Sequence, residues 1–433
     1  LSQRLATITD EKGNLLTTFS GSGGFYGSAL TTEQPGGVQK YTVSDYRDAT
    51  GAGSLYLSNP LGAQTTYTYS IVGGIARLTG QSQPAGAGCG PAGSATGYDA
   101  NGNVASRTDF NGNKTCFSAD PARNLETVRI EGLAAATPCP ADLAGYAVPA
   151  EQAQRKTTTA WHPDWRLPAR RAGPTRLTTW VYHGQPDPGA GNSPAACAPA
   201  DALLPDSKPI AVVCKRIEQA TTDATGSQGF AAAADGAPRV WAYTYNRHGR
   251  VLSEDGPRSD VADLTTRDYY THDAACPGAD LGPGRDKGCR GQLRQLTNAL
   301  GQPTRFTRYN AHGQVEELID ANGLVTTHAY DARQRLRRRS VGSELTTYEY
   351  DAAGQLKRLT PPDGSTLDYD YDAAHRLVRI EDAQGNRIAY TLDAAGNRKQ
   401  EEIRDADHQL LKTLSRDYDA LGRLQTLTGV GGE

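Results

Sequence analysis

A tyrosine followed by an aspartate recurs at intervals of about 21 residues in the last third of this 433-residue chain. The pairs are Tyr309-Asn310, Tyr330-Asp331, Tyr350-Asp351 and Tyr371-Asp372, spaced by 21, 20 and 21 residues, and the series continues at Leu392-Asp393 and Tyr418-Asp419. A fixed period of this length is typical of repeat architectures, in which each unit buries its core only against its neighbours. The period therefore favours a repeat fold over a compact enzyme domain.

One repeat unit is predicted to contain two short strands and two tight turns. Residues 346–350 form a β-branched and aromatic run, which suits a pleated strand. Asp351 to Gly354 is predicted to form a turn, because aspartate bonds nearby backbone groups and glycine adopts a positive φ without strain. Residues 355–360 then indicate a second strand and residues 361–364 a second turn. Further turn glycines repeat the pattern at Gly313 and Gly323, Gly385 and Gly396, and Gly422.

The composition supports an all-β chain of hairpins. Tyrosine outnumbers phenylalanine 21 to 6, which fits half-buried faces where the hydroxyl still reaches a partner. We expect the tyrosine rings of neighbouring hairpins to lie beside one another across the strands. No segment has a helical period with caps, so the predicted fold is tandem β-hairpins in one continuous antiparallel sheet with almost no helix.

The chain divides into three zones of different regularity. Residues 1–130 carry degraded copies of the unit, residues 131–297 are irregular, and residues 298–433 are regular. Loops rich in proline, glycine and alanine at 184–210 and 224–238 are predicted to be insertions on one face of the sheet. The chain begins at Leu1 and holds no methionine. We therefore expect it to be an internal piece of a longer polypeptide.

The seven cysteines suggest disulfide bonds that close the irregular loops. Three pairs bracket such loops, namely Cys116 with Cys139, Cys197 with Cys214 and Cys276 with Cys289, which leaves Cys89 over. Disulfides that close loops stabilise small or irregular structure and indicate an oxidising destination outside the cytoplasm. The alternative is that all seven are reduced. No C-x₂-C pair or nearby histidine pair is present, so no zinc site and no cofactor is predicted.

Two aspartate- and asparagine-rich segments resemble the start of a calcium loop. They are residues 99–103 and 109–113. A helix-loop-helix calcium loop has its glycine at position six, whereas here Gly102 and Gly112 stand at position four. The segments are therefore interpreted as Asn-Gly hairpin turns.

His162 and Asp164 are the residues that most resemble a catalytic pair. No serine or cysteine can be tied to them by a motif, and packing of His162 between Trp161 and Trp165 is the favoured interpretation. The chain also lacks the metalloprotease, hydrolase and phosphate-loop motifs. No catalytic, cofactor-binding or metal-binding residue is predicted, and the chain is not expected to be an enzyme.

Charge gives no indication of nucleic acid or membrane binding. The net charge is −3, and no apolar run approaches the roughly 20 residues of a membrane-spanning helix. One basic run stands out, at Arg333, Arg335, Arg337, Arg338 and Arg339. We expect the odd-numbered arginines to share a solvated strand face and to pair with Glu316 and Glu317; the alternative is a face that lines a cavity and contacts an acidic cargo.

The units Tyr-Asp-x-x-Gly-x-Leu at residues 350–356 and 418–424 resemble the YD repeats of Rhs proteins. These bacterial proteins are related to the shell components of Tc toxins and to the animal teneurins. The resemblance is strong over residues 298–433 and looser before them, where residues 161–168 and 221–226 also look like Rhs sequences. Several tandem copies make the signal specific.

This resemblance implies a sheet that spirals into a hollow shell. In bacterial members the shell encloses a C-terminal toxic domain, which an aspartyl self-cleavage centre releases. That junction and the toxic domain are not among these 433 residues. The resemblance thus implies a shell segment of a secreted toxin that protects an enclosed domain of the same polypeptide, with a delivery-apparatus protein as a further partner and a competing or host cell as the target. The alternative function is a cell-surface adhesion module whose exposed tyrosines bind glycans.

Overall fold

The chain folds almost entirely into β-strands. The computed structural model describes residues 5–9, 13, 15–24, 27–86, 90–149, 153–272 and 289–431. Within these ranges there is no α-helix, and the two 3₁₀-helices are η1 (Pro188–Ala190) and η2 (Gly229–Ala231). No helix in the described part of the chain is long and apolar enough to cross a bilayer.

The first half of the chain contributes sixteen of the strands. They are β1 (Thr7–Thr9), β2 (Leu15–Gly24), β3 (Gly27–Gln34), β4 (Val38–Arg47), β5 (Gly53–Ser58), β6 (Gln64–Val72), β7 (Ile75–Gln83), β8 (Ala92–Tyr98), β9 (Val104–Thr108), β10 (Asn113–Asp120), β11 (Leu125–Ala134), β12 (Arg155–Trp161), β13 (Pro168–Gly173), β14 (Arg176–Tyr182), β15 (Pro186–Asp187) and β16 (Ser193–Pro194).

The second half is a run of short strands with regular spacing. They are β17 (Val213–Ala220), β18 (Arg239–Tyr245), β19 (Val251–Asp255), β20 (Thr265–Tyr269), β21 (Leu293–Thr297), β22 (Pro303–Tyr309), β23 (Val315–Ile319), β24 (Val325–Tyr330), β25 (Leu336–Val341), β26 (Glu344–Tyr350), β27 (Leu356–Thr360), β28 (Leu367–Tyr371), β29 (Leu377–Asp382), β30 (Arg387–Leu392), β31 (Arg398–Arg404), β32 (Leu410–Tyr418) and β33 (Leu424–Gly431).

All but two of these strands form one antiparallel sheet of 31 strands. Each strand pairs with the next one along the chain, and the single skip is from β14 to β17. The skipped strands, β15 and β16, pair only with each other in a small ribbon. The predicted fold, tandem hairpins in a continuous antiparallel sheet, is confirmed.

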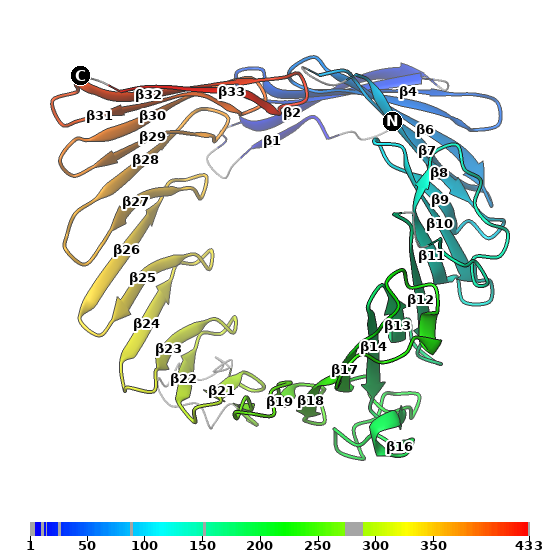
Figure 1. Cartoon of the computed structure of the whole chain (residues 1–433). Coiled ribbons are helices and arrows are strands. Elements are labelled where there is room, and N and C mark those ends of the chain that lie inside the picture. The colour runs from blue at the N-terminus through cyan, green and yellow to red at the C-terminus, as the bar shows by residue number, and fades with distance from the viewer. Residues whose placement is uncertain are drawn as a thin grey trace.

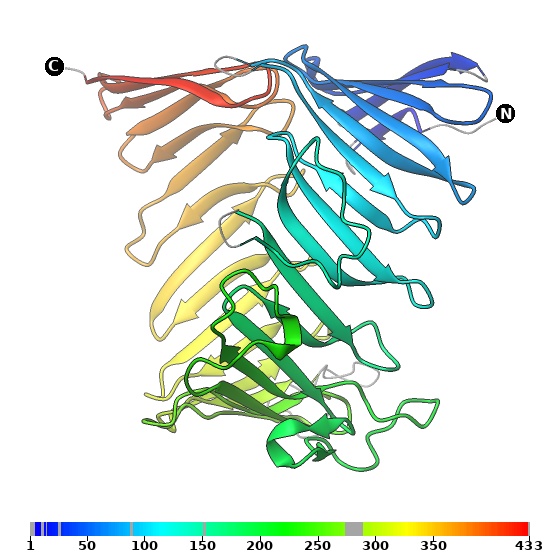
Figure 2. The ribbon, with the colours of Figure 1, turned by 45° about the vertical axis from the view of Figure 1, so that its right-hand side comes forward.

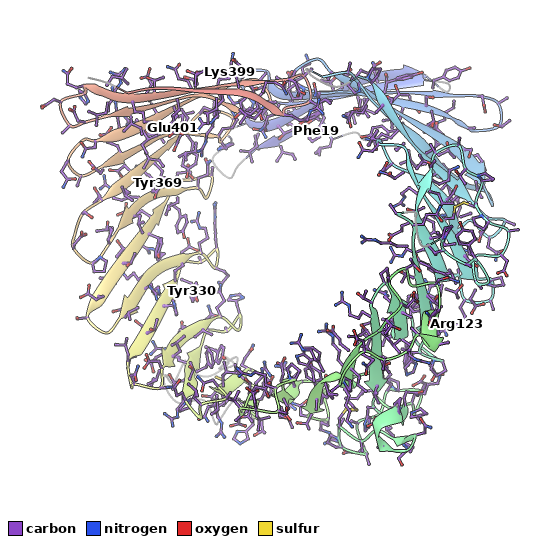
Figure 3. All side chains as sticks on the ribbon, viewed as in Figure 1. Phe19, Arg123, Tyr330, Tyr369, Lys399 and Glu401 are labelled. Carbon is purple, nitrogen blue, oxygen red and sulfur yellow. A yellow bond between two sulfur atoms is a disulfide. The ribbon has the colours of Figure 1, made fainter. Side chains whose placement is uncertain are left out.

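The sheet bends into a ring, which Figure 1 shows end on. The first strands and the last strands, blue and red, meet at the top of the ring, and they remain adjacent when the molecule is turned by 45° in Figure 2. With the described side chains drawn, the centre of the ring stays open (Figure 3). The sheet thus encloses a hollow, as the resemblance to Rhs shells implies.

Turn chemistry explains the spacing of the hairpins. The turn between β26 and β27 closes with a backbone hydrogen bond from Gly354 N–H to Asp351 O at 3.1 Å. Gly354 has a φ of +97°, in the left-handed region that glycine adopts at little cost. Two sister turns place Gln334 and His375 at this position, with φ of +64° and +62°. The turn geometry is therefore kept even where the glycine is replaced.

Buried apolar side chains form two clusters in the described part of the chain. The larger cluster contains Cys116, Val128, Ile130, Leu133 and Leu143, where residues 135–149 fold back over β10 and β11. A smaller cluster joins Tyr270, Cys289 and Tyr309. From β23 to β33 the wall is a single layer of mostly half-buried strands, because no second layer covers the described part of the sheet there.

Candidate functional site

The aspartate of each YD pair holds the turn that follows it. In Asp372, Oδ1 accepts the backbone N–H groups of Ala374 and Arg376 at 2.9 Å, and Oδ2 accepts from Arg376 Nε at 2.7 Å. Partial burial alone would raise the pKa of Asp372, but the hydrogen bonds from Arg376 leave that pKa below its usual value. The aspartate therefore acts as a fixed, charged anchor of the turn.

The same arrangement recurs in the other predicted repeat residues. Asp331 accepts from the backbone of Arg333 and Arg335, and Asp419 from that of Leu421 and Arg423, at 2.9 to 3.0 Å. Asp351 accepts from the backbone N–H of Gln355 at 2.8 Å. The turn glycines Gly396 and Gly422 have φ of +94° and +78°.

The tyrosine of each YD pair connects its hairpin to the preceding one. Backbone pairing between β25 and β26 runs only from Arg338 opposite Thr347 to Val341 opposite Glu344. Beyond that range the hydroxyl of Tyr350 donates to the carbonyl of Leu336 at 2.8 Å. The side chain thus supplies a hydrogen bond where the backbone ladder has stopped.

This bond repeats along the wall. Tyrosine hydroxyls also join Tyr98 to Leu78, Tyr269 to Val251, Tyr309 to Leu293, Tyr330 to Val315, Tyr371 to Leu356 and Tyr418 to Arg398, at 2.6 to 3.2 Å. We call this set the tyrosine ladder. Phenylalanine cannot make the bond, which accounts for the excess of tyrosine in the sequence. Burial raises the pKa of Tyr309 to about 12, so its hydroxyl stays a donor.

The expected ring-to-ring contacts between repeat tyrosines are wrong for the regular repeats. In the described residues the ring of Tyr350 lies under the guanidinium of Arg335, 4.4 Å from its Cζ, and Tyr330 stacks on His328 of its own strand. Tyr270 and Tyr309 do form an edge-to-face pair at 6.5 Å. Arginine or histidine usually fills the space between rings because consecutive YD tyrosines are separated by a whole hairpin.

Consecutive turns also bond to one another along one rim of the ring. Gln355 Nε2 donates to the carbonyl of His375 at 2.7 Å, and the two side chains share a further hydrogen bond at 2.9 Å. Arg376 Nη1 continues the chain to Asp393 O at 2.8 Å. This turn rim is therefore a second line of contacts, parallel to the tyrosine ladder.

The ring closes where this rim meets the N-terminal strands. The backbone N–H of Gln39 donates to Ala394 O at 2.8 Å, and Asn59 Nδ2 donates to Ala420 O at 2.8 Å. These bonds link the β3–β4 and β5–β6 turns to the turns after β30 and β32. We call this contact zone the seam. It joins residues 361 positions apart in the chain.

Glycines at the seam allow the close approach. A Cβ atom on Gly86 would overlap the side chains of Asp419 and Arg423, and one on Gly396 would come within 3.3 Å of Gln39 Nε2. Gly396 and Asp419 were predicted only as turn residues. Their second role, at the seam, depends on how far the sheet curves, which the repeat period does not specify.

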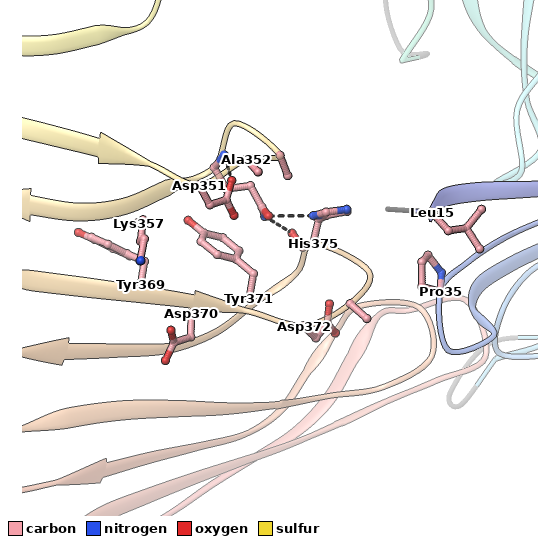
Figure 4. Close-up of a pocket in the computed structure, with 13 residues that line it drawn as sticks. Leu15, Pro35, Asp351, Ala352, Lys357, Tyr369, Asp370, Tyr371, Asp372 and His375 are labelled. Atoms are coloured by element: carbon pink, nitrogen blue, oxygen red, sulfur yellow. Dashed lines mark hydrogen bonds between the residues drawn. The ribbon is translucent and has the colours of Figure 1, made fainter. Parts of the chain in front are cut away.

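A pocket of about 580 Å³ opens beside the seam (Figure 4). Leu15 and Pro35 of the N-terminal strands face the turn residues Asp351, Asp372 and His375 across it. Its lining mixes apolar, acidic and basic groups, the basic ones being Lys357 and His375. The pocket is a consequence of how the seam packs.

The predicted cysteine pairs are close in space where they can be seen. Cys116 with Cys139 and Cys197 with Cys214 each form a disulfide. Cys289 is also disulfide-bonded and is fully buried, whereas its expected partner Cys276 lies outside the described residues. Cys89 lies outside them as well.

His162 supports a tight corner of the chain. Its Nδ1 accepts the backbone N–H groups of Asp164 and Trp165 at 3.1 and 3.3 Å. Burial lowers its pKa, which keeps the ring neutral and able to accept. Arg123, labelled in Figure 3, donates to the carbonyls of His162 and Trp165 at 2.8 and 2.9 Å.

The packing predicted for His162 is wrong in detail. The ring contacts Tyr182 edge to face at 5.2 Å instead of lying between the two tryptophans. Trp161 turns away and donates from Nε1 to Glu126 O at 2.7 Å. A β-bulge between Ala160 and Trp161 shifts the register and explains the difference.

The basic run also differs from its prediction. Arg333 and Arg335 belong to a turn, because β25 begins only at Leu336. Arg335 pairs with Asp331 at 2.7 Å. The carboxylates expected as partners, Glu316 and Glu317, pair with Arg308 at 3.2 and 3.9 Å. The expected alternation of side chains across one strand fails here, because the run of arginines begins in the turn before β25.

The acidic segment at 99–103 forms the expected hairpin turn. Asp99 Oδ1 accepts the N–H groups of Asn101 and Asn103 at 2.9 and 2.8 Å.

The residues that sequence reasoning missed are the rim contacts Gln355 and Asn59. Glutamine after a turn glycine is the only local signal, and it becomes informative only once the hairpins are known to stack.

Comparison with known proteins places these features in a family. The RHS repeat model matches residues 290–325, 309–344, 330–366, 350–386 and 371–410. A comparison with curated protein sequences gives no match. The crystal structure of TcdB2-TccC3-Cdc42 is similar with a TM-score of 0.55 and 11% identity over 95% of this chain. The Tc holotoxin pore of Photorhabdus luminescens is similar with a TM-score of 0.45 and 14% identity over 98%.

The repeat and the ring together define a class of β-shell proteins built from tandem hairpins. Within that class, residues 290–410 of the chain carry RHS repeats, and the ring resembles the TcdB2-TccC3-Cdc42 structure in fold. It spans 22% of the TcdB2-TccC3-Cdc42 chain that it matches and 25% of the holotoxin pore chain. In fold it therefore corresponds to a part of the much longer TcdB2-TccC3-Cdc42 chain.

Proposed function

We propose that this chain is a wall segment of a hollow shell that encloses and protects a toxic domain of the same polypeptide before its delivery into a competing or host cell. The observation that supports this most is the seam. A sheet of 31 strands that returns to contact its own beginning, 361 residues away, separates an inside from an outside.

The proposed mechanism is steric. Consecutive strands are paired by backbone hydrogen bonds, and the tyrosine ladder extends this closure to the rim where the backbone pairs end. A protease or target outside such a wall has no path through it wider than the spacing between hydrogen-bonded strands. The function depends on the continuity of the wall, so we assign no single residue as essential and no catalytic step to this chain.

The disulfides support a secreted or extracellular destination. The Cys116–Cys139 and Cys197–Cys214 disulfides both close loops of the irregular zone. Such bonds persist in oxidising compartments and are rare in the cytoplasm of mesophiles. We propose that the shell acts outside the cell that makes it, with a delivery-apparatus protein as partner.

The adhesion alternative has less support. It requires exposed repeat tyrosines, whereas Tyr330, Tyr350 and Tyr371 are half-buried and their hydroxyls are bonded to the backbone. Tyr46 remains largely exposed, but it stands outside the regular repeats. A wall built on these tyrosines fits a container better than a glycan-binding surface.

The test is protease protection of the polypeptide that carries this segment together with its flanking regions. Gly86→Leu places a side chain against Asp419 and Arg423 at the seam, whereas Gly90→Leu, four residues along, meets open space within 4 Å. We expect the unaltered protein and Gly90→Leu to protect an enclosed domain, and Gly86→Leu to expose it to cleavage at least several-fold faster.

Electron microscopy of the same samples gives a second readout. A closed shell with internal density supports the proposal. The container function is rejected if the ring is empty and the toxic domain is digested at the same rate with and without the shell.

A further inference from the structure

Two cysteines and a histidine converge at the base of the insertion that separates β14 from β17. His183 follows the last residue of β14, Cys197 lies in the insertion three residues after β16, and Cys214 lies in β17. One ligand atom from each of the three residues lies within 4.8 Å of the other two. Among the described residues this is the one group of three or more histidine, cysteine or carboxylate side chains with such spacing.

The backbone holds all three positions independently of the disulfide. The N–H of His183 donates to Val212 O at 2.9 Å, and the carbonyl of Cys197 accepts from Tyr245 N–H at 2.8 Å. Cys214 is the extra residue of a bulge, because Tyr182 pairs with Val213 while the preceding residue pairs with Lys215. A bulge re-aims a side chain, and here it directs Cys214 toward the insertion.

The side chain of His183 is oriented toward the sulfurs. Its ligand nitrogen lies within 4.8 Å of both sulfur atoms. Nδ1 accepts the backbone N–H of Cys197 at 3.3 Å, and a metal ion bound at Nδ1 would replace this long hydrogen bond. The residue is largely buried and Cys214 more so, at 9% and 4% exposed. The cluster is therefore largely buried, with Cys197 partly exposed, and reduction of the disulfide would give it two sulfur donors beside one nitrogen.

We propose that reduction of the Cys197–Cys214 disulfide converts this cluster into a binding site for Zn²⁺. A dithiol reductant transfers two electrons to the disulfide, the S–S bond breaks, and the reductant leaves as its own disulfide. The two thiols then lose their protons to solvent as the metal binds both thiolates and the neutral His183 ring. Two thiolates and one imidazole form a donor set that tetrahedral zinc accepts readily.

The required movement is small. The Cα atoms of Cys197 and Cys214 are 5.3 Å apart. Two thiolates on one zinc ion lie roughly 3.8 Å apart, given Zn–S bonds of about 2.3 Å. Rotation about the Cα–Cβ bonds supplies that separation with the backbone in place.

The site offers three protein ligands and leaves one position for water. Asp187 is near in sequence and buried, but Oδ1 accepts from Gly189 N–H at 2.9 Å and Oδ2 from Lys215 Nζ at 2.6 Å. Both oxygens are engaged, so Asp187 orders the insertion instead of binding metal. The sequence did not suggest the site, because its ligands stand 14 and 17 residues apart and match no zinc motif.

The Cys116–Cys139 disulfide provides a control within the chain. Cys116–Cys139 lies against Val128, Ile130 and Leu133 in the apolar cluster, which contains no histidine. Replacing Cys116 and Cys139 with serine removes these two thiols from the assay and leaves the His183 cluster unchanged.

The experiment titrates Co²⁺ and then Zn²⁺ into the folded chain carrying the Cys116→Ser and Cys139→Ser changes, before and after treatment with a phosphine reductant. We expect no binding while the Cys197–Cys214 bond is intact. After reduction we expect about one Co²⁺ per chain with a thiolate-to-cobalt absorption band, which Zn²⁺ displaces. Cys214→Ser should abolish the band, and His183→Ala should weaken metal binding at least tenfold, whereas His248→Ala should have no effect.

The strand signal in circular dichroism confirms that each variant is folded. The proposal is overturned if reduced protein with two free thiols at Cys197 and Cys214 binds no metal, or if His183→Ala binds it equally well. It is also overturned if the reductant cannot open this disulfide in the folded chain, because the site would then never form.

Discussion

The regular repeats and the irregular middle of the chain are stabilised in different ways. Between residues 290 and 431 the fully buried side chains are few, and the wall is held by turns, the tyrosine ladder and the turn rim. Between residues 113 and 220 insertions fold over the sheet and create an apolar cluster around Ile130 and two disulfides. The first region repeats one set of directional bonds, whereas the second builds a local core.

This difference indicates where each region can be damaged. In a repeat array each unit contacts only its neighbours, so loss of one hydrogen bond has a small and local effect. In the middle region one buried residue contacts several segments, and its loss leaves a cavity that the sheet cannot fill. Because such an array need not unfold in one step, the local free energy of opening is the quantity to compare.

The largest expected effect is Ile130→Ala in the apolar cluster. Ile130 is fully buried against Val128 and Leu133. Truncating a buried isoleucine typically costs about 2–5 kcal/mol. We expect hydrogen exchange, measured by mass spectrometry on peptides from β10 to β12, to accelerate by more than tenfold.

The matched change in the regular repeats is Ile388→Ala in β30, where the side chain is only half-buried. Its opening free energy should fall by clearly less than that of Ile130→Ala. Equal losses of opening free energy for the two variants would mean that the single-layer wall also has a buried core. The proposed difference in how the two regions are stabilised would then be wrong.

Gly354→Val should have the largest effect within the regular repeats. Valine at a φ of +97° is strained, and its Cβ would come within 3.1 Å of Arg335 Nη1. A non-glycine residue in such a conformation costs about 1–3 kcal/mol. Peptides spanning β26 and β27 should exchange faster, while those of the middle region should not change. Lys357→Val, on the adjoining exposed strand position, is the control and should be near neutral; equal exchange for both would contradict the turn requirement.

Tyr350→Phe tests the tyrosine ladder with a smaller change. It removes the hydroxyl that donates to Leu336 O and keeps the ring. A hydrogen bond of this kind contributes about 0.5–1.5 kcal/mol. Tyr348→Phe, on the same strand, removes a hydroxyl for which no such backbone bond is seen in the described residues. A cost for Tyr348→Phe as large as that for Tyr350→Phe would show that the ladder does not couple the hairpins.

The repeat fold was predictable because its signals are local. The tyrosine–aspartate pairs and turn glycines specify the hairpins, and Gly354 and Asp351 occupy the predicted turn. The seam was not predictable, because Asn59 and Ala420 meet only after the curvature of the sheet from β6 to β32 has accumulated. Bulges, such as the one before Trp161, shift side chains between faces without a clear sequence signal.

Acidification should destabilise the regular repeats before the irregular middle, and this is the smallest of the expected effects. Five described aspartates of the regular repeats have a pKa below the usual value, namely Asp331, Asp363, Asp372, Asp382 and Asp419. In Asp419 the main cause is the hydrogen bond from the Arg423 side chain, followed by the backbone N–H of Arg423. A carboxyl whose pKa is lower in the folded state stabilises the fold above its unfolded value, and that contribution is lost as pH falls through the folded value.

Tryptophan fluorescence reports on the irregular middle alone in this test. All four tryptophans, Trp161, Trp165, Trp180 and Trp241, lie in the irregular middle, and the regular repeats contain tyrosine instead. Between residues 153 and 245 the described aspartate with a lowered pKa is Asp164, which is bound by Lys208 on an exposed loop. Disulfides do not titrate in acid, so the middle should persist. Below about pH 4, the usual range for free aspartate, amide exchange in peptides from β26 to β33, corrected for the intrinsic effect of pH, should accelerate before tryptophan fluorescence shifts. The reverse order would show that the aspartate turns are not what holds the regular wall together.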